Sequence, residues 1–293
     1  MAARLHELPP VPYAHMVFTV PCTLAEHCQA QPETLYRALF NAASQAVLQL
    51  FRQRHGTKPG IIAVLHTWGQ NLHFHPHIHL IVTAGGLDTA GQWKPTPEGY
   101  VLPVKALSGI FRAKCFNALE KLGQDLPAKR LPKQWVVHAR PAQGTPGSIL
   151  LYLARYVYRV SIDESRILEV GEKTVTFRYK DYQDQEKTKT MTLDGTEFLR
   201  RFLQHILPDG FVKVRHYGLF AHATKAQSLE KLRSSLPAYC RSVEAATKAI
   251  LALLASTTTP PPPPQCPRCQ SQDLTATEVL PLPQAMEHWP QAP

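Results

Sequence analysis

The 293-residue sequence predicts an α+β fold, with a central, mainly antiparallel sheet flanked by helices. Hydrophobic residues make up 44% of the chain, which is enough to build a buried core. Strand-like and helix-like segments interleave without the strict alternation that is typical of a parallel sheet. The longest apolar run near the C-terminus, Ala249–Ala255, is far shorter than the roughly 20 residues that a membrane span needs. We therefore expect no transmembrane helix and no membrane partner.

The first part of the chain predicts three strands and one long helix. His15–Val20 is strand-like, and Pro32 is suited to the first turn of a helix. Apolar residues then recur at helical spacing as far as Phe51. Ile61–Thr67 and His77–Thr83 are strand-like and are separated by a short loop, so they predict a hairpin.

The second part of the chain predicts shorter strands, further helices and a linker. We expect strands at 135–139, 174–180, 188–193 and 211–217, and helices at 146–159, 195–207 and 226–255. The run TTTPPPPP over 257–264 favours a stiff polyproline II spacer. We therefore expect one folded domain with C-terminal helices over 1–255, a Thr/Pro-rich linker over 256–265 and a flexible tail over 266–293.

Cys266 and Cys269 in the tail form a C-x-x-C pair, which is half of a zinc ribbon. Structural zinc usually takes four ligands. His288 is the only histidine that follows, and no second cysteine pair is present, so a zinc site and a metal-free remnant both stay open. The N-terminus shows no secretory signal, and we expect reduced thiols in a cytosolic compartment.

The charge balance favours a polyanionic partner. Lys and Arg number 32 against 22 Asp and Glu, which gives a net charge of +10. The excess is concentrated in residues 101–140, which hold eight basic and two acidic residues. This segment predicts either a nucleic-acid-binding face or a solvated helix face.

A histidine cluster is the first group of residues that suggests chemistry. Five of the fourteen histidines lie between 66 and 79, and the core of the cluster is His75-Pro76-His77-Ile78-His79. Because side chains alternate along a strand, His77 and His79 share one face at roughly 7 Å and can converge on one metal ion. Ile78 then points to the core. The alternative is that both histidines are polar residues on a solvent-facing strand.

A third ligand follows from the register of the hairpin. If the hairpin is centred near residues 71–72, His66 lies opposite His77, about 5 Å away. His66 is therefore the first candidate. His75 is the second, although Pro76 suggests that the strand begins only after it. A Gln or a carboxylate from elsewhere stays open.

Two tyrosines form the second group. Tyr152 and Tyr156 are four residues apart on a predicted helix, so both hydroxyls lie on one face beside an apolar stripe. Taken alone, this pattern is better explained by ordinary packing at the edge of the core. A tyrosine hydroxyl, with a pKa of about 10, can attack a phosphate that a metal ion polarises. Arg155 or Arg159 would neutralise the developing charge.

Three segments carry a family resemblance: HPHIHLIVTAGGL, WVVHARPAQGTPGSILLYLARYVYRVSIDESRI and FLRRFLQHILPDGFVKVRHYGLFA. Together with PVPYAHMVFTVP and HTWGQNL they resemble the rolling-circle insertion-sequence transposases of the insertion-sequence-ninety-one type, which have two tyrosines and an HUH motif (His, hydrophobic residue, His). The resemblance covers roughly residues 8–222. His77 and His79 match the histidine pair, and Tyr152 and Tyr156 match the tyrosine pair. Family members usually carry a cysteine-rich zinc-binding N-terminal segment, which we do not find in this sequence.

The resemblance implies an HUH single-stranded DNA endonuclease fold, in which the sheet carries the histidines and a helix presents the tyrosines. It implies a transposase that nicks and joins single-stranded or hairpin DNA at transposon ends, with 1–255 as the catalytic domain. We expect a divalent cofactor, Mg²⁺ or Mn²⁺, and a nucleoid-associated protein. The alternatives are a relative that binds transposon ends without catalysis, a related replication-initiator or relaxase nuclease, and a metal hydrolase that acts on small molecules.

Overall fold

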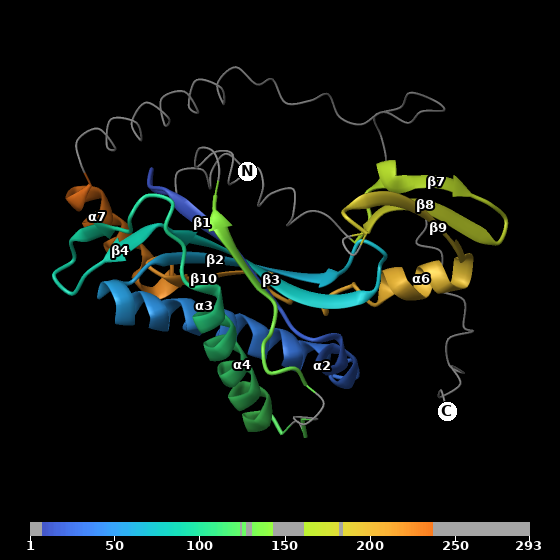
Figure 1. The fold of residues 1–293 in the computed structure, drawn as a ribbon, viewed down its shortest axis with the longest axis horizontal. Helices are drawn as coiled ribbons and strands as arrows, with labels where there is room; N and C mark the ends of the chain where they lie inside the picture. The colour runs from blue at the N-terminus through green and yellow to red at the C-terminus, as the bar shows by residue number, and fades with distance from the viewer. Residues whose placement is uncertain (1–7, 124, 127–130, 143–160, 182–183, 237–293) are drawn as a thin grey trace, which may run out of the picture. The chain divides into compact units, whose positions relative to one another are not determined.

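The computed structural model describes residues 8–123, 125–126, 131–142, 161–181 and 184–236, all of which belong to one compact unit, Met1–Lys248. Its centre is a five-stranded sheet with the strand order β10-β2-β3-β1-β6 (Figure 1). Every neighbouring pair in this sheet is antiparallel. The strands are β1 (Tyr13–Thr19), β2 (Gly60–Trp68), β3 (Phe74–Thr83), β6 (Val137–Pro141) and β10 (Val214–Gly218). The predicted α+β class with a central antiparallel sheet is confirmed.

Two helices cover one face of the sheet. The long helix α3 (Pro32–His55) starts with Pro32 in its first turn and ends at Gly56, whose φ of 62° is a left-handed conformation that glycine adopts at little cost. It packs against α4 (Val104–Lys121) and against strand residues such as Ile78 and Leu80, which are fully buried. The short helix α2 (Cys22–His27) adds to this main core.

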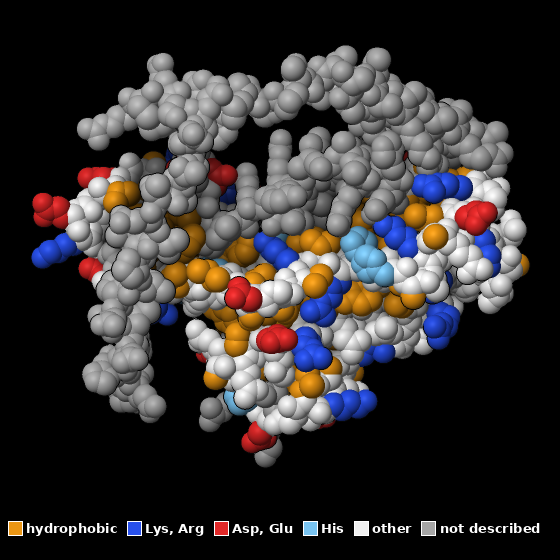
Figure 2. All heavy atoms as spheres, turned by 180° about the vertical axis from the view of Figure 1, so that it is seen from behind, with side chains coloured by type: hydrophobic (Ala, Val, Ile, Leu, Met, Phe, Trp, Pro, Cys, Tyr) orange, Lys and Arg blue, Asp and Glu red, His pale blue; other side chains and the backbone are white. Residues whose placement is uncertain are grey.

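The opposite face of the sheet has a different covering. Because side chains alternate along a strand, this face receives Tyr13, Val64 and Ile81. These residues form a second apolar cluster with Leu229 and Leu232 of α7 (Lys225–Ser235). The histidines of β2 and β3 lie on this face as well. Seen from behind, the described surface in Figure 2 mixes hydrophobic, basic and acidic side chains.

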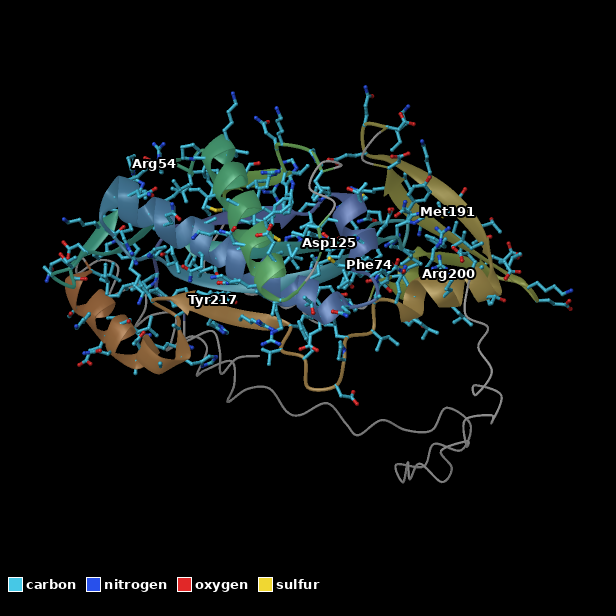
Figure 3. All side chains as sticks on the ribbon, turned by 90° about the horizontal axis from the view of Figure 1, so that it is seen from below. Arg54, Phe74, Asp125, Met191, Arg200 and Tyr217 are labelled. Carbon is cyan, nitrogen blue, oxygen red and sulfur yellow. The ribbon has the colours of Figure 1, made fainter. Side chains whose placement is uncertain are left out.

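A second, three-stranded sheet follows β6 in the chain. It consists of β7 (Ile167–Val170), β8 (Thr174–Asp181) and β9 (Lys187–Asp194), and α6 (Gly195–Leu203) comes directly after it. Figure 3 shows Met191 of β9 and Arg200 of α6 in this region, near Phe74 at the start of β3. Gln204 donates to the carbonyl of Leu72 at 3.0 Å, which ties the end of α6 to the β2–β3 hairpin. A small ribbon of β4 (Gly85–Leu87) and β5 (Trp93–Pro95) completes the described strands.

Most predicted elements are present, with shifted ends. Pro76 lies inside β3 instead of before it, because β1 ends at its pair with His77 and leaves no partner for the missing N–H. Trp135 does not belong to a strand, since its backbone N–H and carbonyl bond to the hydroxyl of Ser108, and β6 begins at Val137. The helix α6 ends at Leu203, earlier than expected.

Some predictions fall outside the described residues. These are the helix at 146–159, the last helix beyond 236, the linker and the tail. The division into a domain over 1–255, a linker and a tail therefore stays a prediction. Among the helices of the described part, none is long and apolar enough to cross a membrane.

Candidate metal centre

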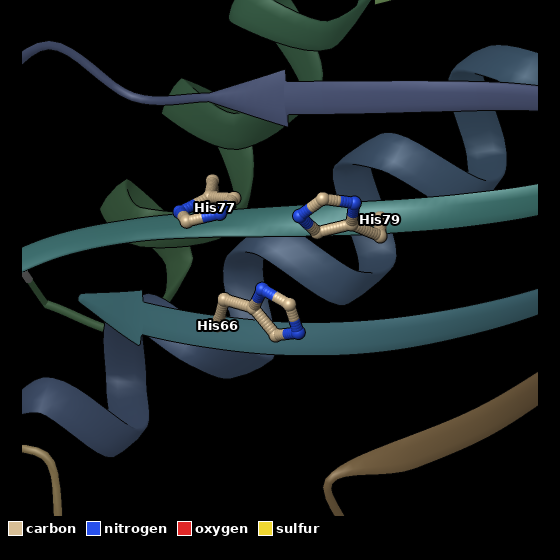
Figure 4. Close-up of side chains that lie close together, drawn as sticks. All are labelled: His66, His77 and His79. Carbon is tan, nitrogen blue, oxygen red and sulfur yellow. The ribbon is translucent and has the colours of Figure 1, made fainter. Parts of the chain in front are cut away.

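Three histidines converge on one face of the central sheet. His77 and His79 lie on β3, and His66 on β2 pairs directly with His77, as the centre of the hairpin predicted. One ligand nitrogen from each lies within 4.8 Å of the others (Figure 4). The ring centroids of His66 and His79 are 4.4 Å apart, and those of His77 and His79 are 5.0 Å apart. These three residues form the histidine triad, which could hold a metal ion.

The triad is not a set of polar residues on a solvent-facing strand. His66 is only 3% exposed and His79 only 8%, while Ile78 between the two β3 histidines is fully buried in the main core. Burial lowers the pKa of His77 to about 4 and the pKa of His79 well below the ordinary value. Both imidazoles are therefore neutral at pH 7, which is the form that binds metals.

A backbone contact orients His77. Its Nδ1 lies 2.7 Å from the carbonyl oxygen of His75, so Nδ1 carries the proton and Nε2 keeps its lone pair for a metal. The second candidate for the third ligand, His75, is outside the triad, although its ring lies 5.5 Å from that of His77. His75 contributes to the site through its backbone carbonyl oxygen, which accepts the hydrogen bond from His77.

His15 on β1 orients His79 in the same way. His15 Nε2 lies 2.9 Å from His79 Nδ1, and the two rings stack. With its proton on Nδ1, His79 would donate a hydrogen bond to His15 Nε2, and its Nε2 would be the nitrogen that binds a metal. Reasoning from the sequence missed His15. The alternation of β1 indicates which residues share its face, but the register between β1 and β3 cannot be read from the sequence.

His66 is held by stacking. Trp68 lies parallel to its ring, with centroids 4.9 Å apart and planes 14° apart. The amine of Lys213 lies 4.9 Å from the centroid of the Trp68 ring, and burial lowers the pKa of this lysine to about 8. Lys213 and Trp68 therefore form a layer against His66 on the β2 side of the triad.

The chemistry of the donors fits a divalent ion. None of the five strands of the central sheet contains Asp or Glu, so no carboxylate of these strands shares the triad. Three neutral imidazoles would leave a bound divalent ion with its full positive charge, which favours an anionic ligand such as a phosphate. Imidazole ligands suit several transition metals, whereas Mg²⁺ prefers oxygen.

The structure does not bring together all of the predicted site residues. Tyr152, Tyr156, Arg155 and Arg159 lie outside the described residues, so their distance to the triad is not part of this structure. The basic segment 101–140 does not form one face beside the triad. Much of it is α4, which packs with α3 on the face of the sheet opposite the histidines. A count of charges along the chain does not show on which face of the sheet each residue lies. Because side chains alternate along β6 and α4 packs on the other face, the basic residues of this segment are separated.

The chain has relatives of known sequence. The model of the Y2_Tnp family, described as "Putative transposase", matches residues 60–228, which include the triad. The chain is 37% identical over 256 residues to "Putative transposase y4qJ" of Sinorhizobium fredii (strain NBRC 101917 / NGR234), covering 80% of this chain and 64% of that protein. It is 30% identical over 258 residues to the transposase for insertion sequence element IS801 of Pseudomonas savastanoi pv. phaseolicola, covering 79% of this chain and 60% of that protein. The chain thus spans less than two thirds of the length of either relative.

Among solved structures, the chain is similar to the conjugative relaxase TrwC in complex with a mutant oriT DNA. That match has 12% identity and a TM-score of 0.33, and it covers 73% of this chain and 71% of the relaxase. A metal-free structure of TrwC with oriT DNA matches with 13% identity and a TM-score of 0.34, over 74% of this chain and 70% of that chain. The family match covers well over half of the 293 residues, and the chain belongs to the Y2_Tnp transposase family, which is of the HUH type.

Proposed function

We propose that this protein nicks and joins single-stranded DNA in rolling-circle transposition, through a metal-assisted phosphotyrosine intermediate. The observation that carries the proposal is the histidine triad, in which His66 and His79 are buried, His77 is half-buried, and one ligand nitrogen of each lies within 4.8 Å of the others, in a chain of a transposase family. The positive net charge and the lack of acidic residues in the central sheet support a polyanionic substrate. The site of action would be the bacterial cytoplasm, at the nucleoid.

The chemistry would be divided between the triad and the tyrosine helix. A divalent ion held by His66, His77 and His79 would make the scissile phosphate more electrophilic and orient it. The hydroxyl oxygen of Tyr152 or Tyr156 would form a bond to phosphorus, while the bond from phosphorus to the 3′ oxygen breaks. The tyrosine loses its proton and the 3′ oxygen gains one, so the products are a 5′-phosphotyrosine and a free 3′-OH. Joining is the reverse reaction with a new 3′-OH.

The substrate would be single-stranded or hairpin DNA from the ends of the element. Arg155 and Arg159 lie in the tyrosine segment and would neutralise charge on the transferred phosphate. In a paired duplex the backbone is less accessible to a nucleophile on a helix. We therefore expect little cleavage of fully paired DNA.

The experiment is an adduct assay with a labelled single-stranded oligonucleotide from the end of the element. With Mn²⁺ or Mg²⁺ present, we expect a covalent, protease-sensitive DNA–protein adduct that EDTA prevents. The double substitution of His77 and His79 by Ala should abolish the adduct. His75→Ala is the matched control, because it lies on the same strand outside the triad and keeps its backbone carbonyl. Full activity in EDTA would refute the metal role, and specific binding without any adduct would favour the non-catalytic alternative.

We also propose that the domain over 1–255 contains the whole chemical step. The linker and the tail follow it, and Cys266 and Cys269 alone do not complete a tetrahedral zinc site. A chain that ends at Ser256 should form the adduct as the full chain does. Loss of the adduct in a truncated chain with an unchanged melting temperature would show that the tail contributes to the site.

A further inference from the structure

The edge strand β6 places one arginine on the face of the histidine triad. In the antiparallel ladder of β1 and β6, Arg140 pairs with His15 and His138 pairs with Val17. Directly paired residues project to the same face of a sheet. Because His15 bonds to His79 on the next strand, Arg140 shares the face of the triad. It lies two strand spacings from β3, which is roughly 10 Å.

The surroundings of Arg140 leave its charge available to a ligand. The side chain is exposed, and no carboxylate of the central sheet lies near it, since these strands contain none. Among the described residues, none forms a recorded salt bridge with it. Its positive charge also reaches the triad, because it adds to burial in lowering the pKa of His15 and of His79.

Lys213, outside the strands, lies over Trp68 on the β2 side of the triad. The other basic residues of the central sheet and of α4 are placed differently. Arg215 is the one other Lys or Arg in the five strands, and it pairs with Ala63 on the face of the main core. Its guanidinium lies over the rings of Phe40 and Phe211, 4.3 and 5.3 Å from their centroids. The basic residues of α4 belong to a helix on that same side. Figure 2 shows Lys and Arg scattered among acidic side chains instead of gathered in one patch. Position, and not charge density, therefore distinguishes Arg140 from the basic residues of the other strands and of α4.

We propose that Arg140 binds a backbone phosphate of the DNA strand that lies across the histidine triad. The inference rests on the proposed function and names a residue that anchors the substrate strand. A guanidinium can donate two parallel hydrogen bonds to phosphate oxygens, and it stays charged at any physiological pH. Bound to a phosphate beside the scissile one, it fixes the register of the strand and leaves the scissile phosphate to the triad. Its contribution is to binding and not to the chemical step.

The test is the salt dependence of DNA binding in EDTA, where cleavage does not interfere. The binding of a labelled single-stranded oligonucleotide is measured by fluorescence anisotropy at several salt concentrations. Arg140→Ala should weaken binding about tenfold and reduce the slope of log K against log[salt] by about 0.7, the value for one phosphate contact on a single strand. Arg140→Lys should keep the slope but bind more weakly than wild type, because it keeps the charge and loses the bidentate geometry.

Lys105→Ala is the matched control, since Lys105 is an exposed basic residue on α4 on the other side of the sheet. It should leave affinity and slope close to wild type. Equal effects of Arg140→Ala and Lys105→Ala would overturn the assignment. If wild type binds and forms the adduct while Arg140→Ala keeps its slope, the assignment of Arg140 fails and the proposed function stands. If wild type does not bind single-stranded DNA, both fail.

A second readout separates binding from chemistry. With Mn²⁺ present, Arg140→Ala should raise the DNA concentration needed for half-maximal adduct formation, while the rate at saturating DNA stays within about twofold of wild type, as expected when a contact stabilises ground state and transition state alike. A lower rate at saturation with unchanged half-saturation would overturn a pure anchoring role. Because Arg140 is exposed, the melting temperature should not change.

Discussion

His15 Nε2 lies 2.9 Å from Nδ1 of His79, although the two residues are not directly opposite in their strands. The ladder of β1 and β3 pairs His79 with Val17, and His15 with Ile81. The contact is therefore diagonal, and the two rings stack with centroids 5.1 Å apart and planes 14° apart. His15 thus fixes the direction of the His79 ring and engages its Nδ1.

The first prediction is that His15→Ala weakens metal binding. Partners that orient a ligand are typically worth about 10- to 100-fold in metal affinity. We expect a loss in this range for Mn²⁺ binding to the metal-free protein, measured by titration calorimetry. His138→Ala is the control, because His138 is an exposed histidine on β6 of the same face. Equal affinities for wild type and His15→Ala would contradict the orienting role.

The second prediction concerns the choice of metal. A triad of neutral imidazoles without a carboxylate from its strands should bind Mg²⁺ more weakly than Mn²⁺, and affinity should rise from Mn²⁺ to Co²⁺ to Ni²⁺. Calorimetric titrations of each ion should give this order, and the variant with Ala at His77 and His79 should lose it. Tighter binding of Mg²⁺ than of Mn²⁺ would indicate oxygen ligands from elsewhere in the chain.

The third prediction concerns His205, a buried residue just after the end of α6. Its Nε2 lies 3.0 Å from the carbonyl oxygen of Leu72 and donates to it, and its Nδ1 accepts from the hydroxyl of Thr67 at 3.2 Å. Burial lowers the pKa of His205 to about 4. In the unfolded chain this histidine has a pKa near 6.5, so as the pH falls it binds a proton in the unfolded chain before it does so in the folded protein. The stability from this group is complete above about pH 6.5 and is lost between about 6.5 and 4.

His205→Gln should therefore flatten the pH dependence of unfolding. One such group contributes at most about 1.4 kcal/mol per pH unit in this window. The free energy of unfolding in urea, measured in EDTA from pH 7.5 to 4.5, gives the slope for both proteins. The buried histidines of β1 and β3 act in the same direction in both proteins, so the variant should keep part of the slope. The slope of wild type should be steeper, because it also contains His205. An unchanged slope in His205→Gln would show that His205 is charged or exposed in the native state.

The sequence predicts local geometry well at this site and distant pairings poorly. The pairing of His66 with His77 follows from a short hairpin, whose centre is determined by its loop. The contact between His15 and His79 joins residues 64 positions apart, and the position of Arg140 depends on a further strand pairing. Such registers are set by the packing of whole strands, which no short motif encodes.

Helix α4 is an element that the sequence analysis did not predict, and the reason is a different one. Its buried residues, such as Leu107, Phe111 and Leu119, follow helical spacing. From the charge count alone, the basic residues of this segment predict either a binding face or a solvated helix face. The apolar stripe makes it a packing helix, whose polar side chains are solvated. Pro76 also lies inside a strand that was predicted to begin after it. The end of β1 makes a proline acceptable at this position of a central strand.

The last prediction is that Tyr152 and Tyr156 are both nucleophiles and act in turn. On the helix that the sequence predicts, one turn would separate their side chains by about 6 Å, so that both could reach one metal-bound phosphate. The first would cleave the donor strand and hold its 5′ end, and the second would accept another strand while that link persists. Because either tyrosine can carry out a single cleavage, Tyr152→Phe and Tyr156→Phe should each leave partial nicking of a single-stranded oligonucleotide, and the double variant should leave none.

Phenylalanine keeps the ring and removes only the hydroxyl, so loss of the adduct with an unchanged melting temperature reports chemistry and not unfolding. Tyr158→Phe is the matched control, because it removes a hydroxyl two residues from Tyr156, on a different face of the predicted helix. Mass spectrometry of the digested adduct identifies the linked residue. A DNA-linked peptide without Tyr152 or Tyr156, or an adduct formed by the double variant, would refute the assignment. We expect Tyr152 to act first, since Tyr156 lies closer to the apolar stripe, and the ratio of the two linked peptides at early times measures this order.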